Sequence, residues 1–285
     1  MRLPSPVILR PRMSANPTPA SDSPAPDGHG TRRPRRGFYL LPNLLTTASL
    51  FSGFYAIVAA IDKHFAPAGM AVFIAMVFDS LDGRIARLTR TESAFGKEYD
   101  SLSDMVSFGL APAIVAYQWG VVRIAEYGRA WGRFGWLACF FYAVAAALRL
   151  ARFNVRTAAL DKRYFEGLPS PSAAATVAGF VWLSSQWREP GLAGLIGAFA
   201  VTAIAGALMV SRFSYASFKS VDWDGPIRFI YLLLVPLAFV LIAGDPPLIL
   251  LIIFGGYALS APVQWLWRRA RRRHRSARRG EGHAE

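Results

Sequence analysis

The residues Phe78–Pro112 read FDSLDGRIARLTRTESAFGKEYDSLSDMVSFGLAP, and the architecture of the whole chain can be worked outward from them. Four aspartates recur there at fixed intervals, and apolar runs long enough to cross a bilayer lie on both sides. Asp79 and Asp82 are three residues apart, and Asp100 and Asp104 are four apart, so each pair occupies one face of a helix. A turn midway between the pairs would bring them together.

Four neighbouring carboxylates repel one another, and an aspartate at the centre of a membrane helix costs about 2.5–3.5 kcal/mol. Divalent cations can offset that cost, because Mg²⁺ and Mn²⁺ prefer hard oxygen ligands. Four carboxylates suffice for two ions about 3.5–4 Å apart, the arrangement that clamps phosphoryl groups in two-metal enzymes. The predicted metal ligands are Asp79, Asp82, Asp100 and Asp104.

Two glycines and an arginine accompany the acids. Gly83 and Gly96 remove side chains beside them, so a ligand could approach the backbone. Arg87, one turn after Gly83, offers a planar group of donors to phosphate oxygens. The competing interpretation is a set of helix-end aspartates that pair with the surrounding arginines and Lys97.

The pattern D-x2-D-G-x2-A-R-x8-G-x3-D-x3-D is complete in this chain and resembles the signature of the CDP-alcohol phosphotransferase family. Members of that family are integral membrane enzymes that move a substituted phosphate from a CDP-linked donor to an alcohol and release CMP. The resemblance implies two Mg²⁺ or Mn²⁺ ions, a homodimer, and direct displacement on phosphorus. It also implies that Asp104 is the catalytic base that takes the proton of the attacking hydroxyl.

The same resemblance indicates where the donor binds. A Pro-Asn-x-x-Thr segment opens the first apolar run, and in the family such a segment belongs to the CDP-donor pocket. Helix capping by its Asn and Thr is the alternative, and Thr89 or Thr91 could take the place of the serine in the turn. The predicted contacts to CDP-diacylglycerol are Asn43, Thr46, Gly83, Arg87, Ser93 and Gly96.

The motif gives the reaction class and leaves the acceptor alcohol open. Segments such as RLARFNV, GLPSPSAAA and LMVS resemble the family members that use L-serine, over residues 38–265. Those members tend to carry Asn and Arg where this chain has Arg212 and Ser214. Glycerol 3-phosphate, inositol phosphate and choline stay open as acceptors, and membrane anchoring is the alternative role for the arginine stripe near residue 150. The candidate acceptor or phosphate ligands are Arg149, Arg152, Arg212 and Lys219.

Composition points to a polytopic membrane protein. The chain has 285 residues, 53% of them apolar, and a net charge of +14. Its single cysteine excludes an internal disulfide, and its four histidines lack metal-ligand spacing. We predict an all-α transmembrane bundle of about eight spans, at residues 40–61, 67–88, 98–120, 134–154, 171–187, 192–211, 227–243 and 247–267.

Charge predicts the topology of these spans. Five of the 32 Lys and Arg residues lie on one side of the bilayer and the other 27 on the opposite side. The positive-inside rule then puts both termini in the cytoplasm and the aspartates at the cytoplasmic face of the inner membrane. We expect three regions: a disordered, basic, Pro-rich tail at 1–36, the transmembrane enzyme domain at 37–267 and a polybasic cytoplasmic tail at 268–285.

The basic tails favour contact with anionic lipid. No folded nucleic-acid-binding module accompanies them, so we expect no nucleic-acid partner. A cation transporter also carries intramembrane acids, but it typically places them at mid-bilayer in repeated, broken helices, whereas these acids lie at span ends. Metal preference, acyl-chain preference and the start at Met1 or Met13 stay open.

Overall fold

A computed structural model of the protein describes residues 40–156, 164–186, 191–216, 236–237 and 240–281. These residues form helices, with one small sheet. The helices are α1 (Leu40–Ile61), α2 (Phe65–Thr89), α3 (Ala94–Asp104), the π-helix η2 (Met105–Leu110), α4 (Ala111–Trp119), the 3₁₀ helix η3 (Val121–Tyr127), α5 (Arg129–Arg156), α6 (Ser170–Ser184), α7 (Leu192–Val210) and α9 (Pro246–Glu281). The strands are β1 (Tyr164–Glu166) and β2 (Ser214–Ala216).

The predicted all-α membrane architecture is confirmed, and six of the eight predicted spans correspond to candidate membrane-spanning helices in the described part of the chain. The described residues contain six helical segments that are long and apolar enough to cross a membrane. The protein is therefore a multi-pass membrane protein. The predicted fifth span is the 15-residue helix α6, which at about 1.5 Å per residue is shorter than the roughly 30 Å hydrocarbon core. The predicted seventh span, 227–243, lies mostly outside the described residues.

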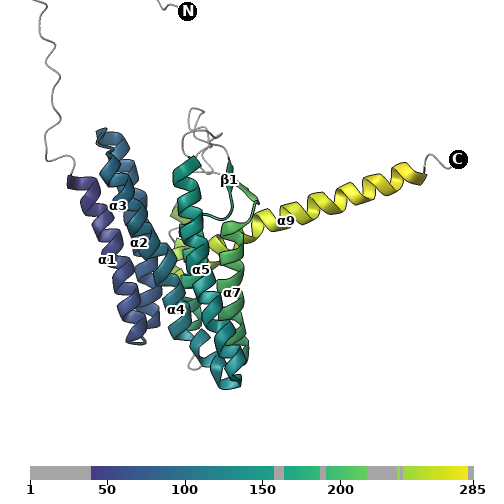
Figure 1. The fold of residues 1–285 in the computed structure, drawn as a ribbon, viewed down its shortest axis with the longest axis horizontal. Coiled ribbons are helices and arrows are strands. Elements are labelled where there is room, and N and C mark those ends of the chain that lie inside the picture. Colours follow the sequence, from purple (N-terminus) through teal and green to yellow (C-terminus); the bar gives the residue numbers. More distant parts are fainter. Residues whose placement is uncertain (1–39, 157–163, 187–190, 217–235, 238–239, 282–285) are drawn as a thin grey trace, which may run out of the picture. The chain divides into compact units, whose positions relative to one another are not determined.

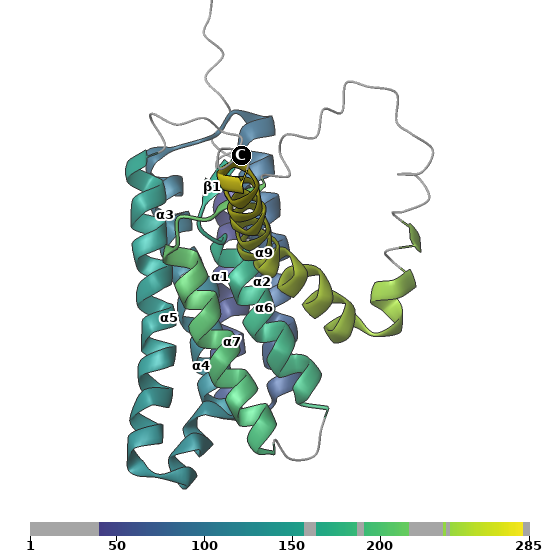
Figure 2. The same ribbon diagram turned by 90° about the vertical axis from the view of Figure 1, so that its right-hand side faces the viewer.

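Helix α6 lies within the bundle. It packs against α2, α4, α7 and α9, and in Figure 2 it lies between α2 and α7. Ten of its fifteen residues are buried, most of them Ala, Val or Gly. Small side chains let helices approach closely in a membrane. Protein therefore covers most of the surface of α6.

Helices α1 and α2 form a hairpin and run side by side (Figure 1). The buried face of α1 repeats small residues every three or four positions, which lets the backbones come close. Within this contact the Ser49 hydroxyl donates to the carbonyl of Ala75, 3.0 Å away. Ser103 and Ser107 donate in turn to the carbonyls of Thr46 and Ser49 at 3.2 and 3.1 Å. These serines join α1 to α2 and to the α3–η2 segment.

The helical run from α3 to α4 changes its winding directly after Asp104, where η2 begins. Short π segments of this kind are rare and concentrate at functional sites. Pro112 follows in the first turn of α4 and has no N–H to offer the carbonyl of Phe108. The fully buried Tyr142 of α5 donates its hydroxyl to that carbonyl at 3.0 Å. A helix neighbour thus satisfies a polar group that lipid could not.

In α9, Tyr215 likewise pairs with a backbone carbonyl that a proline leaves without its helical hydrogen bond. Pro262 lies inside that helix and leaves the carbonyl of Ala258, four residues earlier, without its helical partner. The Tyr215 hydroxyl, on β2, donates to this carbonyl at 2.8 Å. Burial raises the pKa of Tyr215 to about 12, so the hydroxyl keeps its proton at physiological pH. Helix α9 continues as one helix to Glu281, past the expected domain boundary at residue 267.

The two-stranded sheet was not predicted from the sequence. Strand β1 pairs antiparallel with β2, with Glu166 opposite Ser214. Gly167 follows β1 at φ 80°, and its N–H donates to the carbonyl of Phe213 at 2.9 Å. The next N–H, of Leu168, donates to the carbonyl of Leu208 at 3.0 Å. These bonds tie the start of α6 to the end of α7.

Candidate active site

The chain reverses between the two aspartate pairs, as the sequence predicted. Helix α2 ends at Arg90, which adopts a left-handed conformation with φ 52°. Helix α3 then begins after Ser93, whose hydroxyl accepts the N–H of Gly96 at 2.9 Å. Ser93 is therefore an N-cap residue. The reversal sets the last turns of α2 beside the first turns of α3.

The four acids converge as a result. Asp79, Asp82 and Asp100 each place one carboxylate oxygen within 4.8 Å of the others. The carboxyl group of Asp104 lies within hydrogen-bonding reach of Asp79. Two carboxyl groups this close need a proton or a cation between them. Their positions suit metal ligands, and their individual roles stay predictions.

The cluster fits a metal ion. In the described part of the chain, Oδ1 of Asp100 and Oδ1 of Asp104 are buried and have no hydrogen-bond partner. A buried carboxylate oxygen without a partner is costly. A hard divalent cation would satisfy such oxygens, because it prefers carboxylate ligands. The triad of Asp79, Asp82 and Asp100 could thus hold a metal ion.

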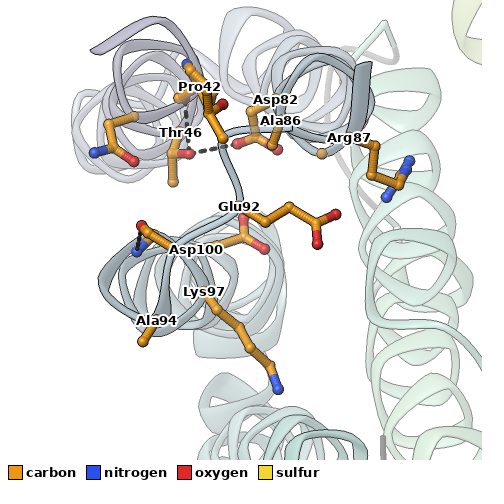
Figure 3. Close-up of a pocket in the computed structure, with 14 residues that line it drawn as sticks. Pro42, Thr46, Asp82, Ala86, Arg87, Glu92, Ala94, Lys97 and Asp100 are labelled. Atoms are coloured by element: carbon orange, nitrogen blue, oxygen red, sulfur yellow. Dashed lines mark hydrogen bonds between the residues drawn. The ribbon is translucent and has the colours of Figure 1, made fainter. Parts of the chain in front are cut away.

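Thr46 holds one of these acids in place from another helix. Its hydroxyl donates to Oδ2 of Asp82 at 2.7 Å, as Figure 3 shows, and lies 3.1 Å from the carbonyl of Pro42. Asp82 is only 4% exposed. The hydroxyl therefore orients a buried carboxylate, which is how residues around a metal site commonly support its ligands.

A cavity of about 500 Å³ opens beside the acids (Figure 3). Every residue predicted to contact the CDP-linked donor lines it, and so do two of the predicted metal ligands. The lining residues are Pro42, Asn43, Thr46, Asp82, Gly83, Ala86, Arg87, Thr91, Glu92, Ser93, Ala94, Gly96, Lys97 and Asp100.

The two glycines of the motif leave space that neighbouring side chains use. A Cβ atom on Gly83 would lie 3.5 Å from Nη1 of Arg87, so the guanidinium group lies close to the bare backbone. A Cβ atom on Gly96 would lie 3.1 Å from Oγ of Ser93 and 3.4 Å from Oδ1 of Asn43. Glycine at position 96 therefore leaves room for the Ser93 hydroxyl that caps α3.

Sequence reasoning missed two charged residues of the cavity, Glu92 and Lys97. Both side chains are exposed, and Figure 3 shows Glu92 between the ends of α2 and α3. Their positions next to Ser93 and Gly96 could have signalled them. Only the geometry of the turn shows that they belong to the cavity.

Comparison with known proteins now identifies the family. The sequence profile of the CDP-alcohol phosphatidyltransferases matches residues 39–212 of this chain. The chain belongs to the CDP-alcohol phosphatidyltransferase family. The matched region holds the cavity, the four acids and the helices that carry them.

Three relatives of this family member illustrate the similarity. A CDP-diacylglycerol–serine O-phosphatidyltransferase of Helicobacter pylori (strain ATCC 700392 / 26695) is 37% identical over 237 residues, which cover 82% of this chain and 94% of the relative. The Saccharomyces cerevisiae protein of the same name is 36% identical over 59% of this chain and 65% of its own. An archaetidylserine synthase of Methanothermobacter thermautotrophicus is 37% identical over 62% and 70%.

Arg149 lies next to the acid cluster in this CDP-alcohol phosphatidyltransferase. It is half-buried on α5, and its charge attracts that of Asp104. Its Nη1 donates to the Ser170 hydroxyl at 2.7 Å. Its Nε is buried and has no hydrogen-bond partner among the described residues. One edge of the guanidinium group is therefore held, and its buried Nε donor is left unsatisfied.

The other predicted acceptor ligands lie in different surroundings. Nη2 of Arg152 donates to the carbonyl of Glu166 at 3.1 Å and approaches that of Met209 at 3.4 Å. This side chain joins β1 to the end of α7, and its predicted role stays untested. Arg212 is exposed after α7, and Lys219 lies outside the described residues.

Asn154 is a further residue that sequence reasoning did not single out. Its amide Nδ2 donates to Oγ of Ser101 at 3.0 Å, and the Ser101 hydroxyl donates to the carbonyl of Lys97. The end of α5 is thereby fixed to α3 beside Asp100. The RFN sequence in which Asn154 occurs was noted for its resemblance, but no local pattern signals this contact.

Proposed function

We propose that the protein transfers the phosphatidyl group of CDP-diacylglycerol to the hydroxyl of L-serine, giving phosphatidylserine and CMP. The observation that carries this proposal is the 37% identity to a serine-using relative over 94% of that relative's length. Such coverage extends past the family motif into the helices around Arg149. The cavity and the acid cluster support the reaction class, because they combine phosphate-binding and metal-binding groups.

The metal site is proposed to hold two divalent cations, Mg²⁺ or Mn²⁺. Asp79, Asp82 and Asp100 would hold the two ions between them, and Asp104 would complete the second site. The support is the convergence of these acids and the unpartnered oxygens of Asp100 and Asp104. Bound cations would neutralise charge on the donor pyrophosphate and on departing CMP. The protein contributes by holding the carboxylates in place through contacts such as that of Thr46 with Asp82.

The cavity beside the acids is proposed to bind the nucleotide part of the donor. Arg87 would bind phosphate oxygens, and Asn43, Thr46 and Ser93 would supply polar contacts. Gly83 and Gly96 keep the backbone accessible there. The diacylglycerol chains would stay in lipid.

The acceptor is proposed to bind between Asp104 and Arg149. The buried, unpartnered Nε of Arg149 suits the carboxylate of L-serine. Asp104 would take the proton of the serine hydroxyl as the oxygen bonds to phosphorus and the bond from phosphorus to the CMP oxygen breaks. The contacts of Arg152 with two backbone carbonyls favour Arg149 over Arg152 for this task.

We further propose an inner-membrane location with the site and both termini facing the cytoplasm, as a homodimer. The distribution of Lys and Arg supports the orientation, and the family resemblance supports the dimer. Contact of the basic end of α9 with anionic lipid is supported by two exposed tryptophans at the membrane boundary. Arg269 lies 5.1 Å from the ring centre of Trp265, and Arg271 lies 3.6 Å from that of Trp267.

The test uses the purified protein in mixed micelles with CDP-diacylglycerol and Mg²⁺ or Mn²⁺. CMP release is followed with L-serine, glycerol 3-phosphate, inositol phosphate or choline, with Asp104→Asn as the control. We expect release with L-serine alone and its loss in the variant. If CMP is released with a different alcohol, that alcohol is the acceptor and the assignment of L-serine is wrong. If CMP is released with none of the alcohols, the proposed reaction is wrong.

A further inference from the structure

Ser170 is a buried polar residue that the proposed reaction does not yet use. It is the first residue of α6, and its side chain has no exposed surface. Its hydroxyl accepts a hydrogen bond from Nη1 of Arg149 at 2.7 Å. This is a short, charge-assisted bond between two helices, of the kind that fixes geometry as well as adding stability.

The bond determines how Arg149 presents its remaining donors. A guanidinium group is planar and rigid, so holding one terminal nitrogen restricts the direction of the others. With Nη1 on Ser170, the buried Nε is left without a partner, and the charge lies close to Asp104. The held edge and the available edge belong to the same plane. Loss of the Ser170 hydroxyl would let that plane turn.

The backbone on both sides of Ser170 fixes the position of this residue. Prolines precede and follow it, and Pro171 fits the first turn of a helix because its φ is already helical. The N–H of Leu168 is bonded to α7. Position 167 requires glycine, because its φ is positive and a Cβ there would collide with the carbonyl of Met209. Ser170 is thus held from both sides.

We propose that Ser170 is a positioning residue that orients Arg149 for the carboxylate of the acceptor. It acts through Arg149 and touches neither the donor nor the reacting atoms. The inference rests on the proposed function, since it assigns the available edge of Arg149 to the acceptor. It predicts that Ser170 affects the acceptor's KM and leaves the donor's KM unchanged.

The first experiment compares Ser170→Ala with Ser184→Ala by steady-state CMP release in mixed micelles. Ser184 is a matched control, because it is a buried serine of the same helix whose Oγ has no partner among the described residues. We expect Ser170→Ala to raise the KM for L-serine about tenfold, the scale of one charge-assisted hydrogen bond. The KM for CDP-diacylglycerol should stay within about twofold, and Ser184→Ala should match the wild type. Ser170→Cys, which nearly keeps the volume and weakens the acceptor, should shift the KM in the same direction even if Ser170→Ala folds poorly.

A double-mutant cycle tests the route through Arg149. In an Arg149→Lys background the Ser170→Ala change should raise the KM for L-serine by less than about twofold, because lysine lacks the planar guanidinium group that Ser170 orients. Equal increases in both backgrounds, or equal increases in the donor and acceptor KM, would overturn the proposal. CMP release by the wild-type protein is measured separately with each of the four alcohols. If glycerol 3-phosphate or inositol phosphate is the acceptor, the same comparison is made with that alcohol and its phosphate, so an error in the substrate and an error about Ser170 give different results. Release with choline, which has no anionic group for Arg149, would overturn the proposal.

Discussion

Replacing Thr46 by Val removes the hydrogen bond between α1 and Asp82, one of the predicted metal ligands. Valine nearly matches threonine in shape but cannot donate to Oδ2 of Asp82. The lost bond is short, at 2.7 Å, and its carboxylate is only 4% exposed. We therefore expect the substitution to weaken metal binding and to leave the helix packing largely intact.

The magnitude follows from the charge and burial of this bond. Hydrogen bonds to charged groups contribute about 1.5–3 kcal/mol. At about 1.4 kcal/mol per factor of ten, the apparent affinity for the divalent cation should fall about 10- to 100-fold. That range matches the usual effect of removing a residue that supports a metal ligand.

The assay is CMP release as a function of free Mg²⁺ or Mn²⁺ at saturating CDP-diacylglycerol and L-serine. Thr47→Val serves as the matched control. Its hydroxyl donates to the carbonyl of Asn43 and contacts the Tyr99 hydroxyl, on the exposed side of α1. The control should show wild-type metal dependence.

Two results would refute this reasoning. The first is a metal dependence of Thr46→Val that superimposes on the wild-type curve. The second is a raised KM for CDP-diacylglycerol at saturating metal with unchanged metal affinity, which would mean that Thr46 acts only through its contact with the donor and not through Asp82.

Three further substitutions test other parts of the structure. Lys97→Ala should raise the KM for CDP-diacylglycerol several-fold in the CMP-release assay if this exposed cation of the cavity attracts the donor's phosphates; an unchanged KM would exclude that role. Tyr142→Phe should lower the free energy of unfolding by about 1 kcal/mol, since it leaves the Phe108 carbonyl unpaired, and thermal unfolding in detergent measures this. Gly167→Ala should lower the unfolding temperature more than Tyr142→Phe, because an added Cβ meets the carbonyl of Met209 at a positive φ; equal unfolding temperatures would contradict the reasoning.

Local spacing was sufficient for much of the candidate site. Intervals of three and four residues place side chains on one face of a helix whatever the helix packs against, so each aspartate pair could be assigned a common face. The reversal between Thr89 and Ala94 then follows from the polar residues between two apolar runs. The six predicted donor contacts also line the cavity, but Asn43, Thr46 and Ser93 were identified through the family resemblance and not through spacing.

The surroundings of each apolar segment could not be predicted from the local sequence. Hydropathy and length indicate that a segment is apolar, but they do not show whether lipid or protein covers it. Residues 171–187 read as an apolar span, and only the structure shows that ten of the fifteen residues of the helix there are buried against neighbouring helices. The winding change at Met105 and the β1–β2 pairing likewise depend on contacts between distant segments.

The sequence alone established the membrane class, the acid pattern and the polar face expected for α2 and α3, because each depends on composition or on short, regular intervals. The reaction family followed from the resemblance of the motif to a known signature. Tertiary structure alone established which partners meet across long separations. Thr46 reaches Asp82 across 36 residues, and Arg149 reaches Ser170 across 21. Such pairs depend on how helices cross and how deeply they pack. Periodicity places a residue on a helix face but does not specify the helix that this face will meet.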